Sequence, residues 1–217
     1  MKVFIIGIAG GTGSRVAGLL VEQGDMVSGL YRRSEQTTVL HAVGTSGVLG
    51  DVATISEREL ASAASGADAL IFTAGSTERD DDSMIDAVDG NGVRKAIAAA
   101  RLAGISQFFL VSVFPEAWRD RDMPKSFEHY MAVKKRADVE LVRSKLDWLI
   151  LRPSTLTDES GTGRVSLGPA EIHSSISRND VAATIAALLH SPSVRKRILE
   201  VTAGNTTIAN AVTALMN

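Results

Sequence analysis

The sequence predicts an α/β protein in which one doubly wound parallel sheet is covered by helices on both faces. Short apolar runs alternate with segments of helical periodicity along the whole of the 217 residues. The runs are apolar at successive positions, which is typical of parallel strands buried on both faces. Right-handed crossovers through the intervening helices give the doubly wound arrangement. Because no linker, repeat or low-complexity segment interrupts the pattern, we expect a single domain over residues 1–217.

Glycine and capping residues mark the elements of the first half of the chain. Ser56 and Glu59 form a capping box at the start of a helix. Gly24 and Gly104 directly follow two other helical patterns, where a glycine commonly ends a helix. The expected strands are residues 3–8, 26–31, 48–49 and 69–74, and the expected helices are residues 14–23, 56–64 and 83–103.

The alternation continues in the second half, where Pro153 is expected to end a strand. The expected strands are residues 107–111, 146–151 and 198–202, and the expected helices are residues 127–144, residues 179–190 and one that begins at residue 208. The least regular stretches are residues 32–47, 76–82, 115–126 and 154–177. Three of them directly follow a strand, so we expect them to surround a ligand site beyond the carboxyl ends of the strands. Residues 154–177 are expected to form a small substrate-side portion.

The composition limits the partners that this chain is expected to have. Its formal net charge of −2 gives no electrostatic reason to expect nucleic acid or an anionic membrane. The sequence has no cysteine, which excludes a disulfide, a thiolate metal site and a cysteine nucleophile. No apolar run is long enough to span a membrane, and the N-terminal one lacks the cleavage pattern of a signal peptide. We therefore expect a cytoplasmic protein with a small-molecule substrate, either a monomer or a homodimer.

The segment "FIIGIAGGTGSRV", residues 4–16, carries three regularly spaced glycines, Gly7, Gly10 and Gly13. An expected strand precedes them and an expected helix follows, which is the context that a dinucleotide-binding motif requires. Gly7 permits the tight turn out of the strand, Gly10 lets the backbone approach a pyrophosphate, and Gly13 lets the helix lie close to the sheet. The turn is one residue longer than in the G-x-G-x-x-G motif. A glycine-rich turn without a ligand is the alternative.

The second expected strand ends in "LYRRSEQ", where Arg32 and Arg33 stand about twenty residues after the glycines. Proteins that bind NAD usually have an acidic residue here for the ribose hydroxyls, whereas the first acid of this chain is Glu35. Two guanidinium groups suit a 2′-phosphate, which they bind through paired, charge-assisted hydrogen bonds. The sequence therefore predicts NADP(H) in preference to NAD(H). A solvated basic loop is the alternative.

Two further strand ends extend the expected cofactor groove. Asp51 and Val52 follow the third strand, where a carboxylate can accept a hydrogen bond from an adenine amino group. Ala74, Gly75 and Ser76 follow the fourth strand, where a small backbone can pass beneath the adenosine ribose. Each signal is weak alone, but their order along the chain predicts one continuous groove.

The expected helix at residues 127–144 carries Tyr130 and Lys134 one turn apart, on the same face. A cation beside a phenol favours the phenolate and lowers the pKa of the tyrosine toward neutral pH. Tyr130 can then donate a proton to a carbonyl that receives a hydride, and Ser112, just past the fifth strand, can hydrogen-bond the same oxygen. A surface pair without a catalytic role is the alternative.

Four segments of the chain resemble the short-chain dehydrogenase/reductase superfamily, in particular its atypical NAD(P)-binding members. They are "GIAGGTG", "VDGNGVRKAIAAARLAGISQFFLVS", "YMAVKKRADVELVRSKLDWLILRPSTLTDESGTGRV" and "SISRNDVA". The resemblance implies a Rossmann-like sheet of about seven parallel strands, with the cofactor along the strand ends. It also implies that Ser112, Tyr130 and Lys134 match the catalytic triad. Together with the strand ends described above, the cofactor contacts expected are Gly7, Gly10, Gly11, Thr12 and Gly13 at the pyrophosphate, Arg32 and Arg33 at the 2′-phosphate, Asp51 and Val52 at the adenine, Ala74, Gly75 and Ser76 at the ribose, and Lys134, Pro153, Ser154 and Thr155 at the nicotinamide end.

The activity that the resemblance implies is an NADP(H)-dependent oxidoreductase that reduces a small carbonyl, quinone or flavin-like acceptor by hydride transfer. A non-catalytic NADP(H)-binding redox sensor of NmrA-like type is the alternative. Only 64 residues follow Pro153 (217 − 153), which leaves little for the substrate lobe of a nucleotide-sugar epimerase. Two positions depart from the family pattern. Val113 follows Ser112 where many relatives have a second hydroxyl residue, and Asp89 stands near the place of an asparagine in better-known members.

Three further features have an ordinary structural interpretation. The four histidines show no metal-ligand spacing, and the acidic run at residues 78–83 is typical of a solvated loop, so no metal site is expected. Trp118, close to Phe114, is expected either to cap the nicotinamide pocket or simply to pack. Arg178 and Asp180 are expected to pair with each other and to cap the helix that follows them.

Overall fold

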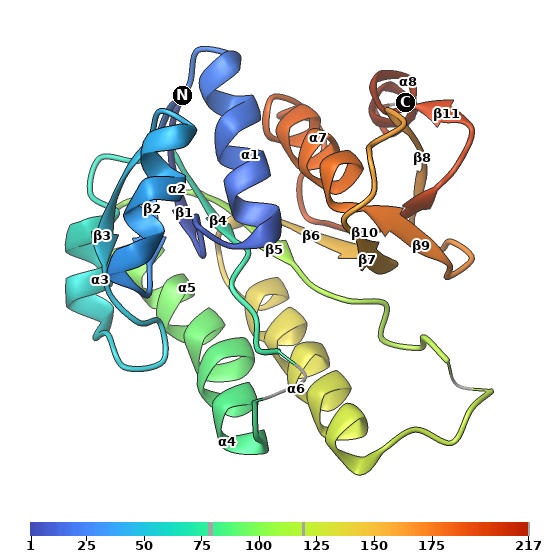
Figure 1. Cartoon of the computed structure of the whole chain (residues 1–217), viewed down its shortest axis with the longest axis horizontal. Coiled ribbons are helices and arrows are strands. Elements are labelled where there is room, and N and C mark those ends of the chain that lie inside the picture. The colour runs from blue at the N-terminus through green and yellow to red at the C-terminus, as the bar shows by residue number, and fades with distance from the viewer. Residues whose placement is uncertain (78–79, 119, 217) are drawn as a thin grey trace.

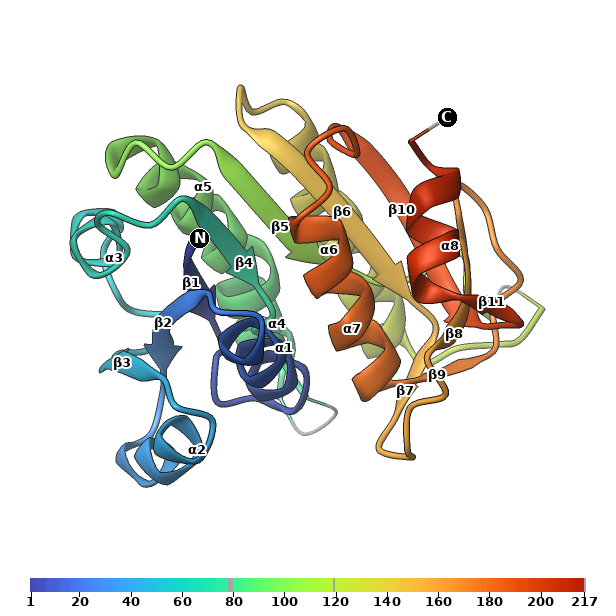
Figure 2. The same ribbon diagram turned by 90° about the horizontal axis from the view of Figure 1, so that it is seen from above.

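A nine-stranded sheet forms the centre of the molecule, with helices packed on both of its faces (Figure 1, Figure 2). This computed structural model describes residues 1–77, 80–118 and 120–216, and the count of strands refers to those ranges. Parallel pairing joins the strands in the order β3-β2-β1-β4-β5-β6-β10. They are β1 (Lys2–Ile6), β2 (Met26–Tyr31), β3 (Ser46–Leu49), β4 (Ala69–Phe72), β5 (Gln107–Val111), β6 (Asp147–Pro153) and β10 (Arg197–Ala203). The expected doubly wound parallel sheet is confirmed.

The order of the strands reverses between β1 and β4. From β1 the chain winds outward through β2 to β3, and then returns to continue on the other side through β4, β5, β6 and β10. The connections that leave β1 and β4 therefore diverge, and a crevice opens between them at the carboxyl ends of the strands. Ligands of doubly wound proteins bind at this switch point.

Successive residues of β1 are buried on opposite faces of the sheet, as the continuous apolar runs predict. Val3 and Ile5 belong to one core cluster, and Phe4 and Ile6 belong to the other. The first cluster lies under α1 (Gly11–Glu22), α7 (Arg178–Leu189) and α8 (Ile208–Ala214). The second lies under α3 (Glu57–Ala63), α5 (Val93–Leu102) and α6 (Lys125–Val142). The sheet is therefore the middle of three layers.

Capping interactions confirm three of the predicted helix ends. The N–H of Glu59 donates to Ser56 Oγ at 3.2 Å, and the N–H of Ser56 donates to Glu59 Oε2 at 3.0 Å. Gly24 and Gly104 end their helices with φ of +88° and +72°, in the left-handed region that favours glycine. Of the acidic run at residues 78–83, residues 78–79 lie outside the described ranges, and Asp81 caps α4 (Asp82–Ile85).

Several short elements lie where no regular structure was expected. β8 (Arg164–Gly168) adds antiparallel to β10, and β11 (Thr206–Thr207) adds antiparallel to β8. In addition, β7 (Thr155–Thr157) pairs with β9 (Ser175–Ser177) in a separate small sheet. At the opposite edge, a 3-10 turn (Ser34–Gln36) and α2 (Thr37–Ala42) precede β3. These segments are too short to show a hydrophobic period, and partners distant in the sequence hold the added strands in place.

The long helix expected at residues 83–103 is interrupted. It consists of α4, a π-helical segment (Asp86–Gly92) and α5. The wider turn brings Asp89 inward, where its side chain is completely buried. Gly90 and Gly92 lie against Val133 and Val52 respectively. Such π-helical turns occur often at functional sites.

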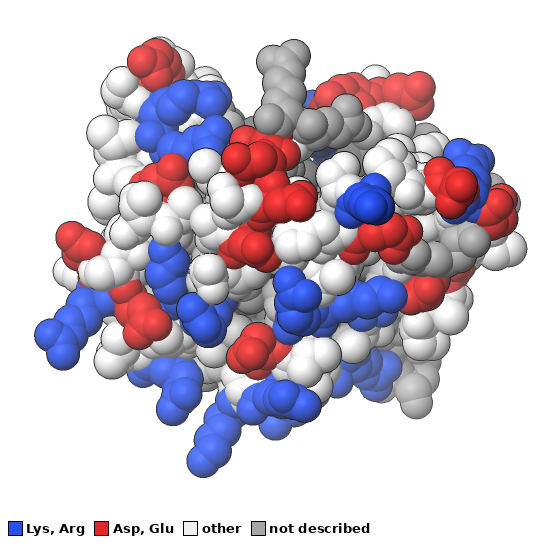
Figure 3. Space-filling model, turned by 90° about the horizontal axis from the view of Figure 1, so that it is seen from below, with Lys and Arg blue, Asp and Glu red and all other residues white. Residues whose placement is uncertain are grey.

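The surface mixes charges of both signs. On the face seen in Figure 3, Lys and Arg side chains lie between Asp and Glu side chains. Within the part of the chain that the structure describes, none of the helices has the length and hydropathy needed to cross a bilayer.

Candidate functional site

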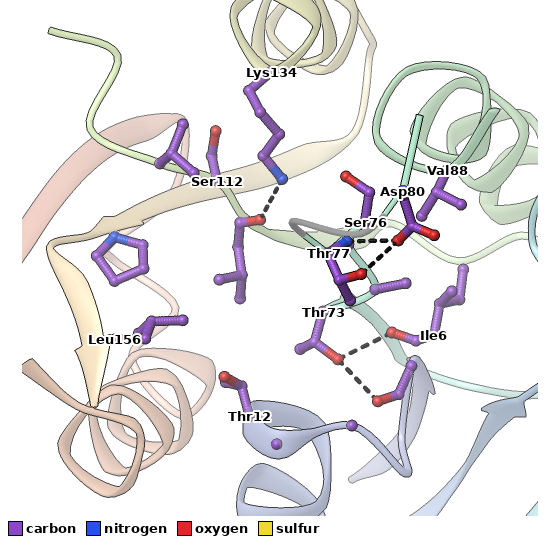
Figure 4. A pocket seen from close by; sticks show the side chains of 18 of the residues that line it. Ile6, Thr12, Thr73, Ser76, Thr77, Asp80, Val88, Ser112, Lys134 and Leu156 are labelled. Atoms are coloured by element: carbon purple, nitrogen blue, oxygen red, sulfur yellow. Dashed lines mark hydrogen bonds between the residues drawn. The ribbon is translucent and has the colours of Figure 1, made fainter. Parts of the chain in front are cut away.

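A cavity of about 670 Å³ lies at the carboxyl ends of the strands, across the switch point (Figure 4). The loops that follow β1, β2, β3, β4, β5 and β6 all contribute to its walls. Because β2 and β3 lie on one side of β1 and β4, and β5 and β6 on the other, the cavity has two ends. Arg32, Arg33 and Asp51 line the first end, and Ser112 and Tyr130 line the second.

The glycine loop is folded tightly against the sheet. Gly7 has φ of +86°, and a Cβ on it would lie 2.8 Å from the backbone nitrogen of Ala74. A Cβ on Gly13 would lie only 2.2 Å from the carbonyl oxygen of Gly7, so no other residue permits this approach of α1 to the loop. The N–H of Gly10 donates to the same Gly7 oxygen at 2.9 Å. The roles predicted for Gly7 and Gly13, turn and close packing, are confirmed.

The start of α1 opens onto the cavity through Gly10, Gly11 and Thr12. Gly10 is the N-cap and provides no side-chain hydrogen bond, and the first turn contains no acidic residue. The first N–H groups of a helix have no partner within the helix, and they carry a partial positive charge. This end of α1 is therefore suited to an anionic group such as a pyrophosphate.

The end of β2 presents Arg32 and Arg33 to the cavity. Gln36 Oε1 accepts the N–H groups of both, at 3.1 Å and 2.9 Å, which fixes the backbone from which the two guanidinium groups extend. Hydrogen bonds from Thr77 hold the pKa of Asp80 below its ordinary value, and Arg32 contributes a smaller effect in the same direction. Arg32 is therefore close enough to lower the pKa of the Asp80 carboxyl, which belongs to the loop after β4.

The loop after β3 is held by two interactions. Asp51 Oδ1 accepts the N–H of Ala53 at 2.8 Å, and Lys95 Nζ donates to the carbonyl oxygens of Ala53 and Ile55 at 2.9 Å and 3.1 Å. Val52 is buried beside Asp51, and both line the cavity. The expected adenine-side residues therefore stand on a fixed backbone.

Tyr130 and Lys134 extend from α6 into the second end of the cavity, with Lys134 Nζ 5.9 Å from the centre of the Tyr130 ring. Lys134 Nζ donates to the carbonyl oxygen of Val111 at 3.3 Å, as drawn in Figure 4, and forms an ion pair with Asp89 at 3.2 Å. The second carboxylate oxygen of Asp89 accepts the N–H of Ser76 at 2.9 Å. Asp89 therefore joins α6 to the loop that follows β4.

The electrostatics of this pair differ from the expectation. Burial raises the pKa of Tyr130 above its ordinary value, Lys134 acts in the opposite direction, and Asp89 adds to the increase. Burial lowers the pKa of Lys134, but Tyr130, Asp89 and Asp138 together raise it above its ordinary value. The predicted lowering of the tyrosine pKa is wrong, because the burial of Tyr130 outweighs the effect of the lysine charge, which the Asp89 carboxylate also offsets in part. Both groups keep their protons at neutral pH.

Ser112 carries a buried hydroxyl that lacks a protein partner. Its side chain is 4% exposed, and in the described part of the chain nothing hydrogen-bonds its Oγ. The N–H of Ser112 donates to the carbonyl oxygen of Leu151 at 2.8 Å, which fixes the residue just past β5. Buried hydroxyls are nearly always satisfied, so one that lines a cavity is suited to a ligand oxygen. This orphaned hydroxyl and the glycine cradle together fit a nicotinamide dinucleotide.

Aromatic side chains line the second end of the cavity around Ser112. The His173 ring contacts Phe114 and Trp118 edge to face, with centroids 5.2 Å and 5.1 Å apart, and Trp118 lies 5.7 Å from Phe127. Burial lowers the pKa of His173, and Arg121 adds to the decrease, so the imidazole is neutral at neutral pH. Trp118 has φ of +57°, a strained conformation that occurs often at ligand sites. It both packs and lines the cavity.

The structure brings nearly all of the expected site residues together in this one cavity. Gly13 is the exception: it packs beneath the loop without lining the cavity. The expected residues that line it are Gly7, Gly10, Gly11, Thr12, Arg32, Arg33, Asp51, Val52, Ala74, Gly75, Ser76, Ser112, Tyr130, Lys134, Pro153, Ser154 and Thr155.

Sequence reasoning missed other residues that line the cavity, among them Phe127, His173 and Arg178. The expected pair of Arg178 with Asp180 is wrong. Arg178 Nη1 pairs with Asp158 at 3.0 Å, whereas Asp180 accepts the N–H groups of Thr162 and Gly163 at 3.0 Å and 2.8 Å. For His173 the sequence offered one indication of a place in the cavity, because the irregular stretch 154–177 that contains it was expected on the substrate side.

Comparison with protein families supports a dinucleotide site. A family model described as NAD(P)H-binding matches residues 7–192, from the glycine loop to just past α7. The chain is 38% identical over 216 residues to YhfK of Bacillus subtilis strain 168, named as an uncharacterized sugar epimerase, with 99% of this chain and 100% of the relative covered.

Two solved structures extend the comparison. A proposed NAD-dependent epimerase/dehydratase from Bacillus halodurans has a TM-score of 0.89 and 32% identity, and the match covers 99% of each chain. ChuY, an anaerobillin reductase from Escherichia coli O157:H7, has a TM-score of 0.78 and 25% identity, covering 95% of this chain and 99% of that one. These relatives share the whole fold, and their names describe different reactions.

Proposed function

The chain belongs to the family of NAD(P)H-binding proteins with a Rossmann-like fold, and from this premise we propose that it is an NADP(H)-dependent reductase of the atypical short-chain dehydrogenase/reductase type. Its acceptor is a small carbonyl, quinone or flavin-like compound, which it reduces by hydride transfer. The observation that carries this proposal is the convergence of Ser112, Tyr130 and Lys134 at one end of a cavity whose other parts fit a dinucleotide.

The preference for NADP(H) rests on Arg32 and Arg33. The two side chains line the cavity at the end of β2, on a backbone that Gln36 holds in place. In this region an acidic side chain would repel a 2′-phosphate, whereas guanidinium groups bind it in paired hydrogen bonds. Bound NADPH supplies the hydride for the reduction.

The proton comes from Tyr130. Its raised pKa keeps the hydroxyl protonated at neutral pH, as a general acid requires. Lys134 stays charged in its ion pair with Asp89, and stabilises negative charge as it develops on the acceptor and on the phenol oxygen. The free hydroxyl of Ser112 donates to the acceptor oxygen and so orients the carbonyl.

The aromatic lining favours a flat, conjugated acceptor within the proposed range. Phe114, Trp118, Phe127 and His173 surround the second end of the cavity, and His173 is neutral. Offset or edge-to-face contact with such rings stabilises a planar π-system more than a compact aliphatic carbonyl. Quinones and flavin-like compounds are therefore expected to react faster than small aldehydes. The reductase named among the relatives is consistent with this choice.

Epimerisation, which appears in the names of two relatives, one of them named as a sugar epimerase, is less well supported in this chain. After Pro153 the chain forms β8, α7, β10 and α8, which complete the sheet and one helical layer. The longest stretches between these elements, residues 154–163 and 169–177, are too short to form a lobe that would enclose a nucleotide-sugar. An epimerase returns its hydride to the substrate, so it would show no net consumption of NADPH.

Calorimetric titration with NADPH and with NADH is the first test. We expect tight binding of NADPH and at least about tenfold weaker binding of NADH, a difference of about 1.4 kcal/mol. Equal affinities would contradict the assignment of Arg32 and Arg33 to the 2′-phosphate. Absence of binding would show that the glycine loop is only structural, and the proposed function would fall.

Steady-state NADPH oxidation with a panel of quinones, flavins and aldehydes tests the chemistry. We expect Tyr130→Phe to keep the affinity for NADPH but to lower kcat by about 10²-fold or more, because only the proton donor is lost. Equal turnover in the variant would exclude Tyr130 as the donor. Tight binding without turnover on any acceptor would instead favour the non-catalytic redox sensor.

A further inference from the structure

Arg178, the first residue of α7, lies across the beginning of α1 rather than in solvent. A Cβ built on Gly11 would lie 3.1 Å from Cδ and 3.2 Å from Nε of Arg178. The helices α1 and α7 run side by side on the same face of the sheet (Figure 1, Figure 2). Arg178 also lines the cavity together with Gly10, Gly11 and Thr12. Its cationic side chain is therefore next to the helix end that is suited to an anion.

Gly11 gains a physical explanation from this contact. The regular spacing of the motif accounts for Gly7, Gly10 and Gly13, but not for a glycine at position 11. Gly11 does not have positive φ and it opens a helix, so its backbone does not require glycine. The missing side chain leaves the space that the aliphatic part of Arg178 occupies.

The position of Arg178 is electrostatically unfavourable for α7 itself. A cation in the first turn of a helix opposes the helix dipole, whereas Asp180 in the same turn favours it. The Asp158 carboxylate compensates in part, at 3.0 Å from Arg178 and 3.2 Å from Arg15. Asp158 is 70% exposed, so this pair contributes little to stability. Residues that break a local preference in this way are commonly kept for function.

We propose that Arg178 binds the diphosphate of the dinucleotide, together with the N–H groups at the start of α1. A guanidinium group can donate two parallel hydrogen bonds to phosphate oxygens, and Asp158 holds it in place beside the cavity. The identity of the ligand rests on the proposed function. Because NADPH and NADH share the diphosphate, Arg178 stabilises both, whereas Arg32 and Arg33 act only on the 2′-phosphate.

Calorimetric titration of Arg178→Gln with both dinucleotides tests the proposal. We expect NADPH and NADH each to bind about tenfold more weakly than to the unmodified protein, a loss of about 1.4 kcal/mol. Arg32→Gln is expected to weaken the binding of NADPH and to leave the binding of NADH unchanged. Arg15→Gln is the matched control, because Arg15 shares Asp158 but does not line the cavity. Arg15→Gln should change the affinity for NADPH and for NADH by less than about threefold.

Three results would overturn the proposal. They are unchanged affinities in Arg178→Gln, a loss confined to NADPH, and an equal loss in Arg15→Gln, which would indicate only long-range charge. If Arg178→Gln does not fold, Arg178→Lys keeps the charge without the paired geometry and should still weaken the binding of both dinucleotides.

Failure of the proposed function is distinguishable from failure of this proposal, since it appears as equal affinities for NADPH and NADH or as absent turnover in the unmodified protein. An unmodified protein that binds neither dinucleotide would overturn both.

A steric variant gives an independent measurement. Gly11→Ala places a Cβ 3.1 Å from Arg178 Cδ, which forces the Arg178 side chain to shift, so we expect the variant to bind NADPH and NADH more weakly and to a similar extent. Gly18→Ala adds the same methyl group to the same helix, 3.7 Å from the nearest atom, and should leave both affinities unchanged. Unchanged affinities in Gly11→Ala would contradict the proposed position of Arg178.

Discussion

Asp89 is the residue on which the arrangement of the candidate catalytic side chains depends most. Its carboxylate is fully buried, pairs with Lys134 and accepts the N–H of Ser76. The sequence placed Asp89 near the site only as a departure from a family pattern. The π-helical segment turns it inward, and periodicity cannot reveal a single wider turn inside a long helical pattern.

Removal of Asp89 is expected to be costly for stability. Asp89→Ala leaves the buried Lys134 ammonium without a counter-charge, so we expect the free energy of unfolding to fall by about 3–5 kcal/mol in urea denaturation. Asp86→Ala is the control. Asp86 lies on the same segment but is half-exposed, and its pairs with His129 and Arg136 lie at 3.3 Å and 3.6 Å. For Asp86→Ala we expect the free energy of unfolding to fall by less than about 1 kcal/mol. Equal losses in the two variants would contradict the structural role of Asp89.

At the scale of elements, the junction of β1 and α1 was predicted most fully. A strand, three glycines and a helix are local in sequence, and Gly13 packs against Gly7 within the same loop. The small sheet of β7 and β9 was missed for the opposite reason. Thr155 pairs with Ser175 in that sheet, so its partners lie far apart in the sequence and each strand has only three residues.

Two alanine substitutions on α1 test the glycine packing. Gly13→Ala would put a Cβ 2.2 Å from the Gly7 carbonyl oxygen, and neither atom can move without its backbone, so α1 has to move. We expect a destabilisation of about 1–3 kcal/mol or more, and weaker dinucleotide binding. Gly18→Ala has room for its methyl group and should stabilise the protein by up to about 1 kcal/mol. Thermal melts of both variants measure the difference, and an unchanged melting temperature in Gly13→Ala would contradict this packing.

At the scale of the whole molecule, the buried ionisable pair in the cavity makes stability depend on pH. The pKa values of Tyr130 and Lys134 are both raised in the folded state. Each folded-state group therefore keeps its proton at a pH where the unfolded chain has begun to lose it, and stability falls as pH rises through this range. The contribution of Lys134 is fully present below its ordinary pKa of 10.5.

We expect the free energy of unfolding to decrease above about pH 10, and Tyr130→Phe to reduce that decrease. Urea denaturation between pH 7 and about pH 11 measures both. Ultraviolet titration of tyrosinate gives a second readout, because the sequence contains only two tyrosines. The Tyr130 titration is identified as the step that is absent in Tyr130→Phe, and its midpoint should lie above pH 10.0, the ordinary pKa of tyrosine. A midpoint below that value would restore the original expectation of an activated phenolate.

Local sequence patterns were enough to predict the seven parallel strands, the longer helices, the dinucleotide loop and nearly all of the site residues that the structure brings into one cavity. These features depend on local patterns, and parallel strands bring their carboxyl ends to one edge of the sheet wherever they occur. Three features became visible only in the folded protein: Asp89 pairs with Lys134, His173 packs against Phe114 and Trp118 in the cavity, and Arg178 crosses Gly11. Each of these contacts joins segments that are distant along the chain, and burial, which sets their strength, exists only in the folded protein.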